Sequence, residues 1–538
     1  MKIATYHKNR GDYVEFYKGE APFHKIQSAN RVYITTLFTF HYDLTVKTIN
    51  HYRKFIDDRR IYVGGIAATI MPEKFKEDVG NVVLQLGQRT SSTDLGYSDD
   101  INIDALPLDY DILDDVIYEY PAANNFFAYA TRGCKRGCKF CAVPKLEPEF
   151  KNVCDLKNQI EKTREKYGDK RNILLMDNNV LYSDRLKTIA KGLNELGFVK
   201  DEATYSPPNP FEILMGKIRR RVETENDTHM VCRSAVDHLQ RRVKNILKEE
   251  TKIEMKGILE EIDGMNTIDI LEKNYERIIE ITDIYRNKKK LQRFIDFNQG
   301  IDARILTNTR MEALSNLPLK PFRLAYDNMK ITERYQQAFR TAYKHGVRHF
   351  SNYMLYNYDD KPEELWERLN NNVQLCKELP EAKLFSFPMK YAPIDKTDRK
   401  CVGEHWTRKE LNAMNVILNV TKGVVMKEED FFSRAYGHTS GEFLKILAMP
   451  DEFIKYRTHF DNNGLNDAWG REYDALSSAE RRRLLKILSK EDNIVPVHLE
   501  NILKFYKMTR EKTEHVIVDS SVDLKNVVAA AFASPAKL

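Results

Sequence analysis

Short apolar segments alternate with longer helical segments over residues 126–388. The six apolar segments are FFAYA, NILLMD, RFIDF, FRLAY, HFSNYML and KLFSFP, at residues 126–130, 172–177, 293–297, 322–326, 349–355 and 383–388. The stretches between them favour helices of about 10–20 residues. This alternation predicts a parallel sheet, because each helix returns the chain so that the next strand runs in the same direction.

Three cysteines follow the first of these segments. Cys134, Cys138 and Cys141 have the spacing C-x3-C-x2-C. The chain has seven cysteines and no apolar signal-peptide core, and this combination favours metal binding or catalysis over disulfides. Gly133 and Gly137 lie beside the thiols, where we expect the backbone to turn tightly.

Two other uses of the cysteines stay open. Structural zinc needs four ligands, usually in two pairs, and the nearest fourth thiol, Cys154, begins a stretch with helical character. The thiols could also be inert loop cysteines. Three thiolates on one loop can instead bind three corners of a cubic iron–sulfur cluster, which leaves one iron open for chemistry.

The triplet resembles the signature of the radical S-adenosylmethionine (SAM) enzymes, because aromatic Phe140 precedes the last cysteine and an apolar strand precedes the loop. The resemblance implies a 4Fe–4S cluster whose open iron chelates SAM, and reductive cleavage of SAM to methionine and a 5′-deoxyadenosyl radical. It also implies an electron donor such as flavodoxin or ferredoxin. The fold that it implies is a partial (β/α)6, TIM-like barrel, here over residues 120–395.

Polar residues follow several predicted strands, where active residues of such barrels lie. Similar stretches face SAM or substrate in radical SAM proteins that have a cobalamin-type domain in front. The candidates for SAM binding are Asp177, Asn178, Asn179, Gln299, Asp302 and Arg304. Asp177 and Tyr391 are also candidates for catalysis. The alternative is that such residues only cap the following helices.

Residues 1–115 contain four short apolar segments, at 2–7, 32–38, 61–65 and 82–87, which predict a small doubly wound α/β domain. This region resembles the cobalamin-binding domain found before some radical SAM barrels. The resemblance implies His7, at a predicted strand end, as a cobalt ligand, and it implies that the small residues at Thr36, Gly64 and Gly65 leave room for the cobalamin. Thr5 stands where that family has an aspartate, and a carboxylate would orient the histidine. A vestigial domain without cobalamin stays open.

The barrel is interrupted at about residues 206–290. The interruption begins with the loop signal SPPNP and continues with helical periods, which predicts a helical insertion. Basic runs at 219–221 and 287–290 indicate a solvated face or a docking surface for RNA or protein. Residues 396–538 predict a helical domain that covers the barrel mouth, with Ser478 as a helix cap and with His405, Trp406 and Arg434 as candidate substrate contacts.

The net charge of +6 is small for 538 residues, so it permits a nucleic-acid partner without indicating one. No run of about 18 apolar residues is present, and we expect a soluble cytoplasmic protein without a membrane partner.

The function predicted is a radical SAM enzyme that acts on RNA, a peptide or a small molecule, with cobalamin-assisted methyl transfer as one reaction type. Methylthiotransferase activity is an alternative, but it usually calls for three further cysteines in the front domain, and residues 1–133 have none. The second alternative is a non-catalytic iron–sulfur or zinc module that binds nucleic acid. The six βα units argue against it.

Overall fold

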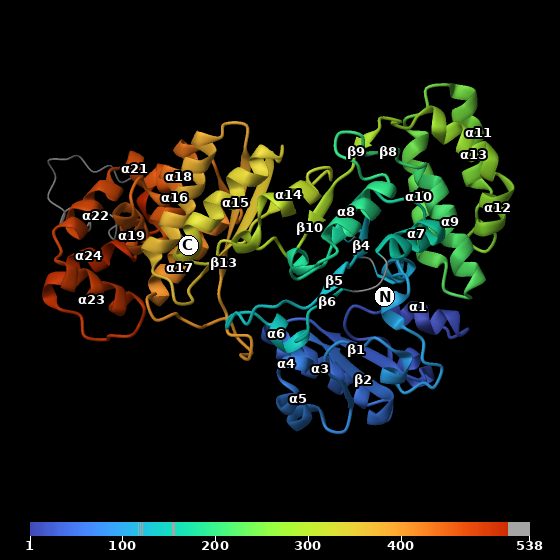
Figure 1. The fold of residues 1–538 in the computed structure, drawn as a ribbon, viewed down its shortest axis with the longest axis horizontal. Coiled ribbons are helices and arrows are strands. Elements are labelled where there is room, and N and C mark those ends of the chain that lie inside the picture. The colour runs from blue at the N-terminus through green and yellow to red at the C-terminus, as the bar shows by residue number, and fades with distance from the viewer. Residues whose placement is uncertain (117, 119, 121, 153–155, 515–538) are drawn as a thin grey trace. The chain divides into compact units, whose positions relative to one another are not determined.

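The computed structural model describes the chain except residues 117, 119, 121, 153–155 and 515–538. It is a mixed α/β protein with parallel sheets and many helices (Figure 1). The chain forms two compact units. Unit 1 comprises Met1–Ile301, Asn308–Pro321 and Ile394–Asp398, and unit 2 comprises Asp302–Thr307, Phe322–Pro393 and Arg399–Leu538.

Unit 1 begins with a parallel sheet of order β1-β2-β3, formed by β1 (Val32–Thr36), β2 (Ile61–Gly65) and β3 (Val83–Gln85). The helices of this region are α1 (Lys2–Asn9), α2 (Phe23–Ser28), α3 (Tyr42–Arg53), α4 (Ile66–Ile70) and α5 (Pro72–Val79). Buried Ile49, Ile61, Val63 and Phe75 form the centre of its apolar core. Three of the four predicted strands are therefore confirmed.

The fourth predicted strand, residues 2–7, is wrong, because these residues begin helix α1. Ala4, Thr5, Tyr6 and His7 are all buried in this helix, and Tyr6 packs in a small core with Leu95. The short segment fits both the helical and the strand period of apolar residues. Packing of Tyr6 against Leu95 favours the helix.

Glycine at the end of β2 has a packing reason. Gly65 has φ +100° and pairs with Thr36 of β1, and a Cβ at Gly65 would overlap the Thr36 carbonyl oxygen. A Cβ at Gly64 would come within 3.1 Å of the Gln85 carbonyl oxygen on the other neighbouring strand. Close approach of the strands therefore accounts for both glycines without a ligand.

We predict that Gly65→Ala lowers the free energy of unfolding by about 2 kcal/mol or more, because it combines a left-handed backbone with a steric overlap. Urea denaturation measures the loss. The matched control is Gly11→Ala, since Gly11 has φ +81° with open space around it. Equal losses in the two variants would contradict the steric explanation.

Three more parallel strands lie in unit 1, in the order β10-β7-β4. They are β4 (Asn125–Ala128), β7 (Asn172–Leu175) and β10 (Ile295–Phe297), and the helices α7 (Leu156–Tyr167), α8 (Leu186–Glu195) and α14 (Asn308–Leu314) accompany them. Phe126 pairs with Ile173, and Ile173 pairs with Ile295, so three buried apolar residues lie in one row across the sheet.

The sheet of unit 2 has the order β11-β12-β13-β14. Its strands are β11 (Phe322–Arg323), β12 (His349–Tyr356), β13 (Lys383–Lys390) and β14 (Val425–Met426), with α15 (Thr332–Lys344) and α16 (Pro362–Glu378) between the first three. β14 is antiparallel and had no signal in the sequence. All six predicted strands exist, but they form two hydrogen-bonded sheets, so a single (β/α)6 barrel stays a prediction.

Hydrogen bonds at the outer edge of β10 help to explain why the strands form two separate sheets. Ile295 donates its N–H to the Pro318 carbonyl, and Lys320 donates to the Ile295 carbonyl. Pro321 follows directly, and a proline has no N–H with which to extend a ladder. The edge of β10 is therefore occupied by the segment that precedes β11.

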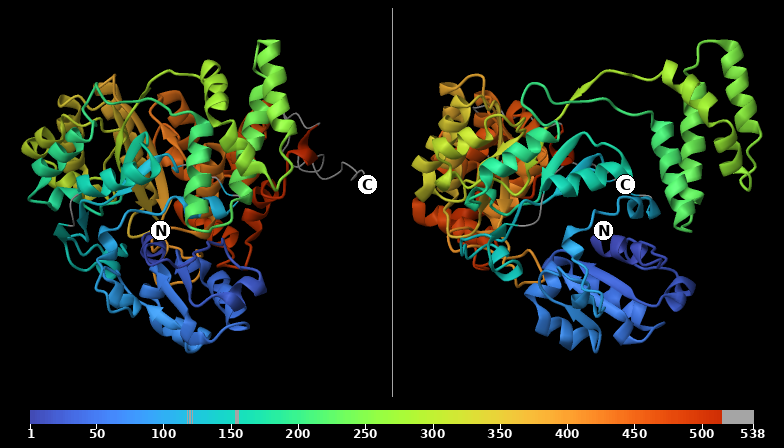
Figure 2. Two further views of the ribbon diagram at one scale, coloured as in Figure 1. Left: turned by 90° about the vertical axis from the view of Figure 1, so that its right-hand side faces the viewer. Right: turned by 45° about the vertical axis from the view of Figure 1, so that its right-hand side comes forward.

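The predicted insertion is helical, and its helices pack against one another (green in Figure 2). They are α9 (Pro210–Glu223), α10 (His229–Val243), α11 (Glu249–Glu260), α12 (Thr267–Lys273) and α13 (Tyr275–Ile284). Phe211, Met215, Leu239 and Ile278 are fully buried in its own apolar core. The short antiparallel pair of β8 (Thr204–Tyr205) and β9 (Leu291–Gln292) joins the two ends of the insertion.

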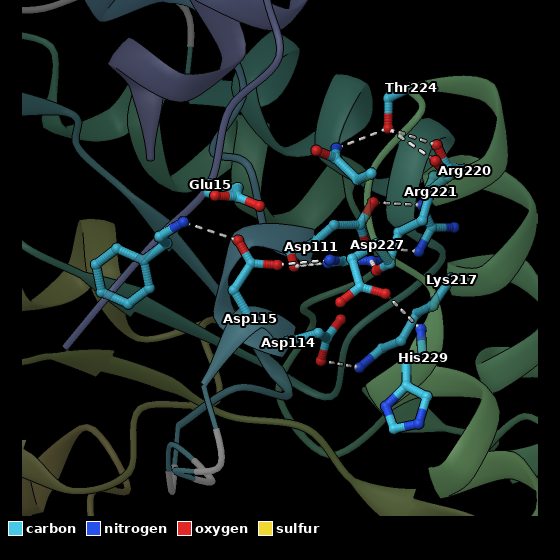
Figure 3. Close-up of polar contacts among 12 residues, drawn as sticks. Glu15, Asp111, Asp114, Asp115, Lys217, Arg220, Arg221, Thr224, Asp227 and His229 are labelled. Atoms are coloured by element: carbon cyan, nitrogen blue, oxygen red, sulfur yellow. Dashed lines mark hydrogen bonds and ion pairs between the residues drawn. The ribbon is translucent and has the colours of Figure 1, made fainter. Parts of the chain in front are cut away.

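The basic run at 219–221 is neither a plain solvated face nor a free docking surface. Arg220 makes two hydrogen bonds of 2.8 and 2.9 Å to Asp111, and Arg221 binds Asp115 at 2.6 Å (Figure 3). Lys217 extends to Asp114 from the same helix at 2.7 Å. The three aspartates belong to one turn of 3-10 helix, Asp111–Asp115. Charge pairs therefore dock the insertion onto the chain that leads into β4.

We predict that Arg221→Met lowers the free energy of unfolding by about 3 kcal/mol or more, because it leaves the Asp115 carboxylate buried without its cation. Burial already raises the pKa of Asp115, and Arg221 acts against that rise. The control is Arg219→Met, since the exposed pair of Arg219 with Glu272 should contribute at most about 1 kcal/mol. Urea denaturation of the two variants tests the contrast, and similar losses would contradict it.

The rest of unit 2 is helical, as expected for the C-terminal region. Its helices are α17 (Arg408–Val420), α18 (Glu429–Tyr436), α19 (Ser440–Ala448), α20 (Asp451–Lys455), α21 (Arg457–Asn462), α22 (Leu465–Asp474), α23 (Ser478–Leu488) and α24 (Glu500–Phe505). The cap of α23 is Ser477 rather than the predicted Ser478, and it forms a capping box with Glu480. No helix in the described part of the chain is long and apolar enough to cross a membrane.

Candidate functional site

The three clustered cysteines lie on a loop between β5 (Thr131–Arg132) and α6 (Val143–Leu146), and all three are half-buried. The Cys141 N–H donates to the Cys138 carbonyl at 3.0 Å, which makes a tight turn within the triplet. β5 pairs antiparallel with β6 (Lys151–Asn152), so both ends of the loop are joined. The loop therefore presents three thiols from one closed segment.

Gly133 has the conformation that the sequence predicted. Its φ is +72°, and a Cβ there would overlap the Glu149 carbonyl oxygen, so only glycine fits. Gly137 differs, because its surroundings are open and its φ is not in the left-handed region. The backbone conformation therefore requires glycine at position 133 but not at position 137.

Glu147 ties the cysteine loop to the strands behind it. Its Oε2 accepts hydrogen bonds of 2.7 Å from the Gly133 N–H and from the Asn178 side-chain amide. Its Oε1 accepts one of 3.1 Å from Arg132, which also binds Asp104 at 2.7 Å. Asn178 is thus engaged with this carboxylate. No pattern in the sequence pointed to Glu147, because its role depends on contacts with distant residues.

Asp177 is buried at the end of β7, and its partners belong to the chain that enters the cysteine loop. Its Oδ1 accepts from the Thr131 hydroxyl at 2.6 Å and from the N–H groups of Thr131 and Ala130 at 2.5 and 3.1 Å. Burial raises the pKa of Asp177 to about 6, and these hydrogen bonds act in the opposite direction. Through these hydrogen bonds, Asp177 joins the end of β7 to the chain that follows β4.

Asn179 is the candidate that contacts the triplet. Its buried side-chain amide donates to the Cys134 sulfur at 3.7 Å. Hydrogen bonds to the sulfurs help set the reduction potential of iron–sulfur clusters, and an N–H donor favours the thiolate that binds metal. Asn179 therefore lies where it can adjust the chemistry of one cluster ligand.

The other SAM candidates divide between the two units. Gln299 is exposed in unit 1, just after β10. Asp302 and Arg304 lie in unit 2 and form a bidentate pair of 2.6 and 3.0 Å. Burial raises the pKa of Asp327, and the charge of Arg304 acts against that rise. The structure thus brings Arg304 close to two carboxylates, and contact of these residues with SAM stays a prediction.

Tyr391 follows β13 in unit 2. Its ring packs edge-on against Tyr358 with a centroid separation of 4.7 Å, and its carbonyl accepts from Asn357 at 3.3 Å. Trp406 is buried and donates to the Asp360 carbonyl at 2.9 Å, which is a structural contact. The catalytic role of Tyr391 stays a prediction.

His7 uses both ring nitrogens within its own domain. Nδ1 lies 2.7 Å from an Asp12 carboxylate oxygen, and Nε2 lies 3.0 Å from the Tyr33 hydroxyl. Asp12 thus supplies the carboxylate that the sequence lacked at Thr5. Thr36 also has local partners, because its hydroxyl donates to the Gly64 carbonyl at 2.9 Å and accepts from the Ala68 N–H at 3.0 Å.

Among the described residues, no three His, Cys, Asp or Glu side chains lie close enough together to hold a metal ion. Cys154, the fourth thiol considered for zinc, is outside the described residues. A four-iron cluster takes each thiolate on a separate iron, so its thiolates need not converge on one ion. Three cysteines on one closed loop fit that donor set.

No family model matches the chain, and no sequence among the curated proteins matches it. One solved structure that resembles it is the radical S-adenosylmethionine methyltransferase TsrM from Kitasatospora setae, with cobalamin and a 4Fe–4S cluster bound. The TM-score is 0.36 at 9% sequence identity, and the match covers 69% of this chain and 65% of TsrM, which is less than two thirds of its length. A similarity of this degree transfers no property of TsrM to this chain.

We predict that Asp177→Ala lowers the free energy of unfolding by about 2 kcal/mol or more, because three buried donors lose their acceptor. Asp177→Asn can keep an oxygen at the Oδ1 position and should be close to wild type in its hydrogen bonds. Urea denaturation at one pH separates the two variants. Equal losses would show that the charge, rather than the acceptor, is what the fold requires.

Comparison of the wild type with Asp177→Asn also gives a prediction of how stability depends on pH. Because the folded-state pKa of Asp177 is raised to about 6 from 3.8, the folded chain binds more protons between these values. Stability contributed by this group therefore falls as pH rises from about 4 to 6 and is constant above that range. The free energy of unfolding of the wild type minus that of Asp177→Asn should decline over this window. A flat difference would contradict the raised pKa.

Proposed function

We propose that this chain is a radical SAM enzyme in which Cys134, Cys138 and Cys141 hold a 4Fe–4S cluster. The observation that supports the proposal is the set of three half-buried cysteines on one closed loop, after a buried strand of a parallel sheet. When bound, the cluster would supply the electron that splits SAM and releases a 5′-deoxyadenosyl radical. We infer that the radical abstracts hydrogen from a substrate whose class is open: RNA, a peptide or a small molecule.

The residues around the loop would position the thiols. Asp177 fixes the backbone at Ala130 and Thr131, and Glu147 fixes it at Gly133. The first cysteine follows Gly133 directly, so this part of the loop starts from a rigid point. Preorganised ligands bind metal without a further ordering cost, and second ligand shells of this kind orient the first.

SAM and the substrate would lie near the carboxyl ends of the strands, which is where ligands bind in parallel α/β folds. Asn178 and Asn179 follow β7 there, and Gln299 follows β10. Asp302, Arg304 and Tyr391, which belong to unit 2, stay separate proposals as contacts to SAM or substrate.

The residues proposed for cobalamin do not favour that cofactor here. Both nitrogens of His7 are already hydrogen-bonded, and Gly64 and Gly65 are explained by strand packing. A histidine ligand needs a free ring nitrogen. The proposed reaction therefore stops at SAM cleavage and hydrogen abstraction, and methyl transfer through cobalamin is not part of it.

We predict that Cys→Ala at position 134, 138 or 141 lowers bound iron after anaerobic reconstitution and reduces 5′-deoxyadenosine formation by about a hundredfold or more, because each thiolate is one of only three ligands. Iron analysis and chromatography of the products of SAM with a chemical reductant measure the two effects. The control is Cys401→Ala, a half-buried thiol outside the loop. A triplet variant with full product formation would overturn the assignment. Iron binding by the wild type without any SAM cleavage would favour a non-catalytic module.

A further inference from the structure

The C-terminal helical part of unit 2 contains a cavity of about 530 Å³, a size within the roughly 300–1,000 Å³ of small-molecule sites. The end of α17, the middle of α18, α20 and the start of α21 form its walls. Ile417, Val420, Phe431 and Ile454 give it an apolar wall. The cavity is separate from the cysteine loop, which belongs to unit 1.

Four cations line this cavity: Arg434, Lys455, Arg457 and Arg510. None of its described lining residues is an aspartate or a glutamate. The four side chains also have no carboxylate within ion-pair distance among the residues that the structure describes. Cations form strong hydrogen bonds with anions, so four cations around one cavity without a carboxylate in ion-pair distance indicate a site for an anion.

Two carboxylates lie near these cations without forming an ion pair with them. Glu452 lies near Lys455 but accepts a hydrogen bond of 3.3 Å from the backbone N–H of Arg510. Asp461 lies near Arg457 but accepts from the side-chain amide of Asn466 at 2.5 Å. Both carboxylates lie beyond ion-pair distance of the cations, so they offset the positive charge of the cavity only in part.

Local contacts hold the cations in place. Arg434 donates to the Thr458 hydroxyl at 2.7 Å, and Arg457 donates to the Arg434 carbonyl. Lys455 and Arg510 lie over the ring of Tyr456, at 4.8 and 5.2 Å from its centroid. Burial and the charge of Arg434 lower the pKa of Arg457, while Asp461 raises it. An anion in the cavity would relieve the repulsion between the two arginines.

A second cavity next to the first shows the contrast. It shares Arg457 and is lined by Lys445 and Arg471, but Glu442, Asp467 and Asp474 line it too. Lys445 pairs with Asp474 at 2.6 Å. The second cavity thus has carboxylates beside its cations, whereas the described lining of the first has cations, neutral polar groups and apolar side chains but no carboxylate.

We propose that the first cavity binds a nucleotide, with its phosphate on Arg434, Lys455, Arg457 and Arg510 and its base against Val420 and Phe431. Arginine binds phosphate oxygens through two parallel N–H groups, which favours phosphate over a halide or a single carboxylate oxygen. Val420 and Phe431 give the cavity apolar surface against which a planar base can pack. The nucleotide is either free or part of an RNA strand, because the phosphate and base are the same in both.

Titration calorimetry with the full chain tests this proposal, with UMP as the probe. UMP lacks adenine, so it does not imitate SAM at the cysteine loop. We expect UMP to bind at least about tenfold more tightly than uridine, since a charge-assisted hydrogen bond contributes that much or more. We expect Arg434→Gln and Arg510→Gln each to weaken UMP binding about tenfold by the same reasoning. Both arginines are exposed, so their loss should leave the fold intact, which circular dichroism checks.

The matched control is Arg471→Gln, an exposed arginine of the second cavity, which should bind UMP as the wild type does. Replacement of the three loop cysteines by alanine should also leave UMP binding unchanged, which separates this site from the proposed SAM site. A 5′-phosphorylated uridine decamer that binds more tightly than UMP and loses affinity in Arg434→Gln would identify RNA as the source, and tighter binding of UMP would identify the free nucleotide. UMP that binds no better than uridine, or that binds both glutamine variants as the wild type, would overturn the proposal.

Discussion

The buried carboxylate of Asp177 is the contact on which the cysteine loop depends. It lies at the end of β7 and accepts hydrogen bonds from the backbone of Ala130 and Thr131, where the chain leaves β4. A parallel pair of strands leaves such backbone groups without ladder partners where the strands end, and burial makes an unpaired group costly. One carboxylate removes that cost and at the same time fixes where the loop begins. Glu147 repeats this arrangement at Gly133, so two acidic side chains define one end of the candidate site.

In unit 2, a buried cation rather than a carboxylate satisfies backbone groups near the strand ends. Arg368 of α16 is fully buried and donates to the carbonyls of Tyr326, Asp327 and Leu355, and it also binds Asp360 at 2.8 Å. These carbonyls lie at or just beyond the carboxyl ends of β11 and β12. An aspartate thus satisfies N–H groups at one sheet, and an arginine satisfies carbonyls at the other. In both sheets a buried charge organises the edge at which ligands of parallel α/β folds bind.

The sequence predicted the strands well, because alternation between apolar strands and helices is a local pattern. It failed at residues 2–7, where a short segment fits both periods and packing of Tyr6 against Leu95 decides for a helix. It identified Asp177 as a polar residue after a strand, but it could not show that the partners of Asp177 are backbone groups some 46 residues away. Glu147 was missed for the same reason. The pairing of β10 with residues 318–320 also depends on distant contacts, and so does the division into two sheets.

Charge shows the limit of sequence reasoning most clearly. The arginines at 219–221 are consecutive, so the sequence marks them as a basic run, yet each has a carboxylate partner in the folded chain. The four cations of the C-terminal cavity come from separate elements and form no run, yet the described residues provide no ion-pair partner for them. Whether a cation is available to a ligand depends on the carboxylates that folding brings beside it, because a cation in an ion pair attracts a further anion less strongly. The place to look for an anionic partner of this protein is therefore the helical end of unit 2 rather than the arginines at 219–221.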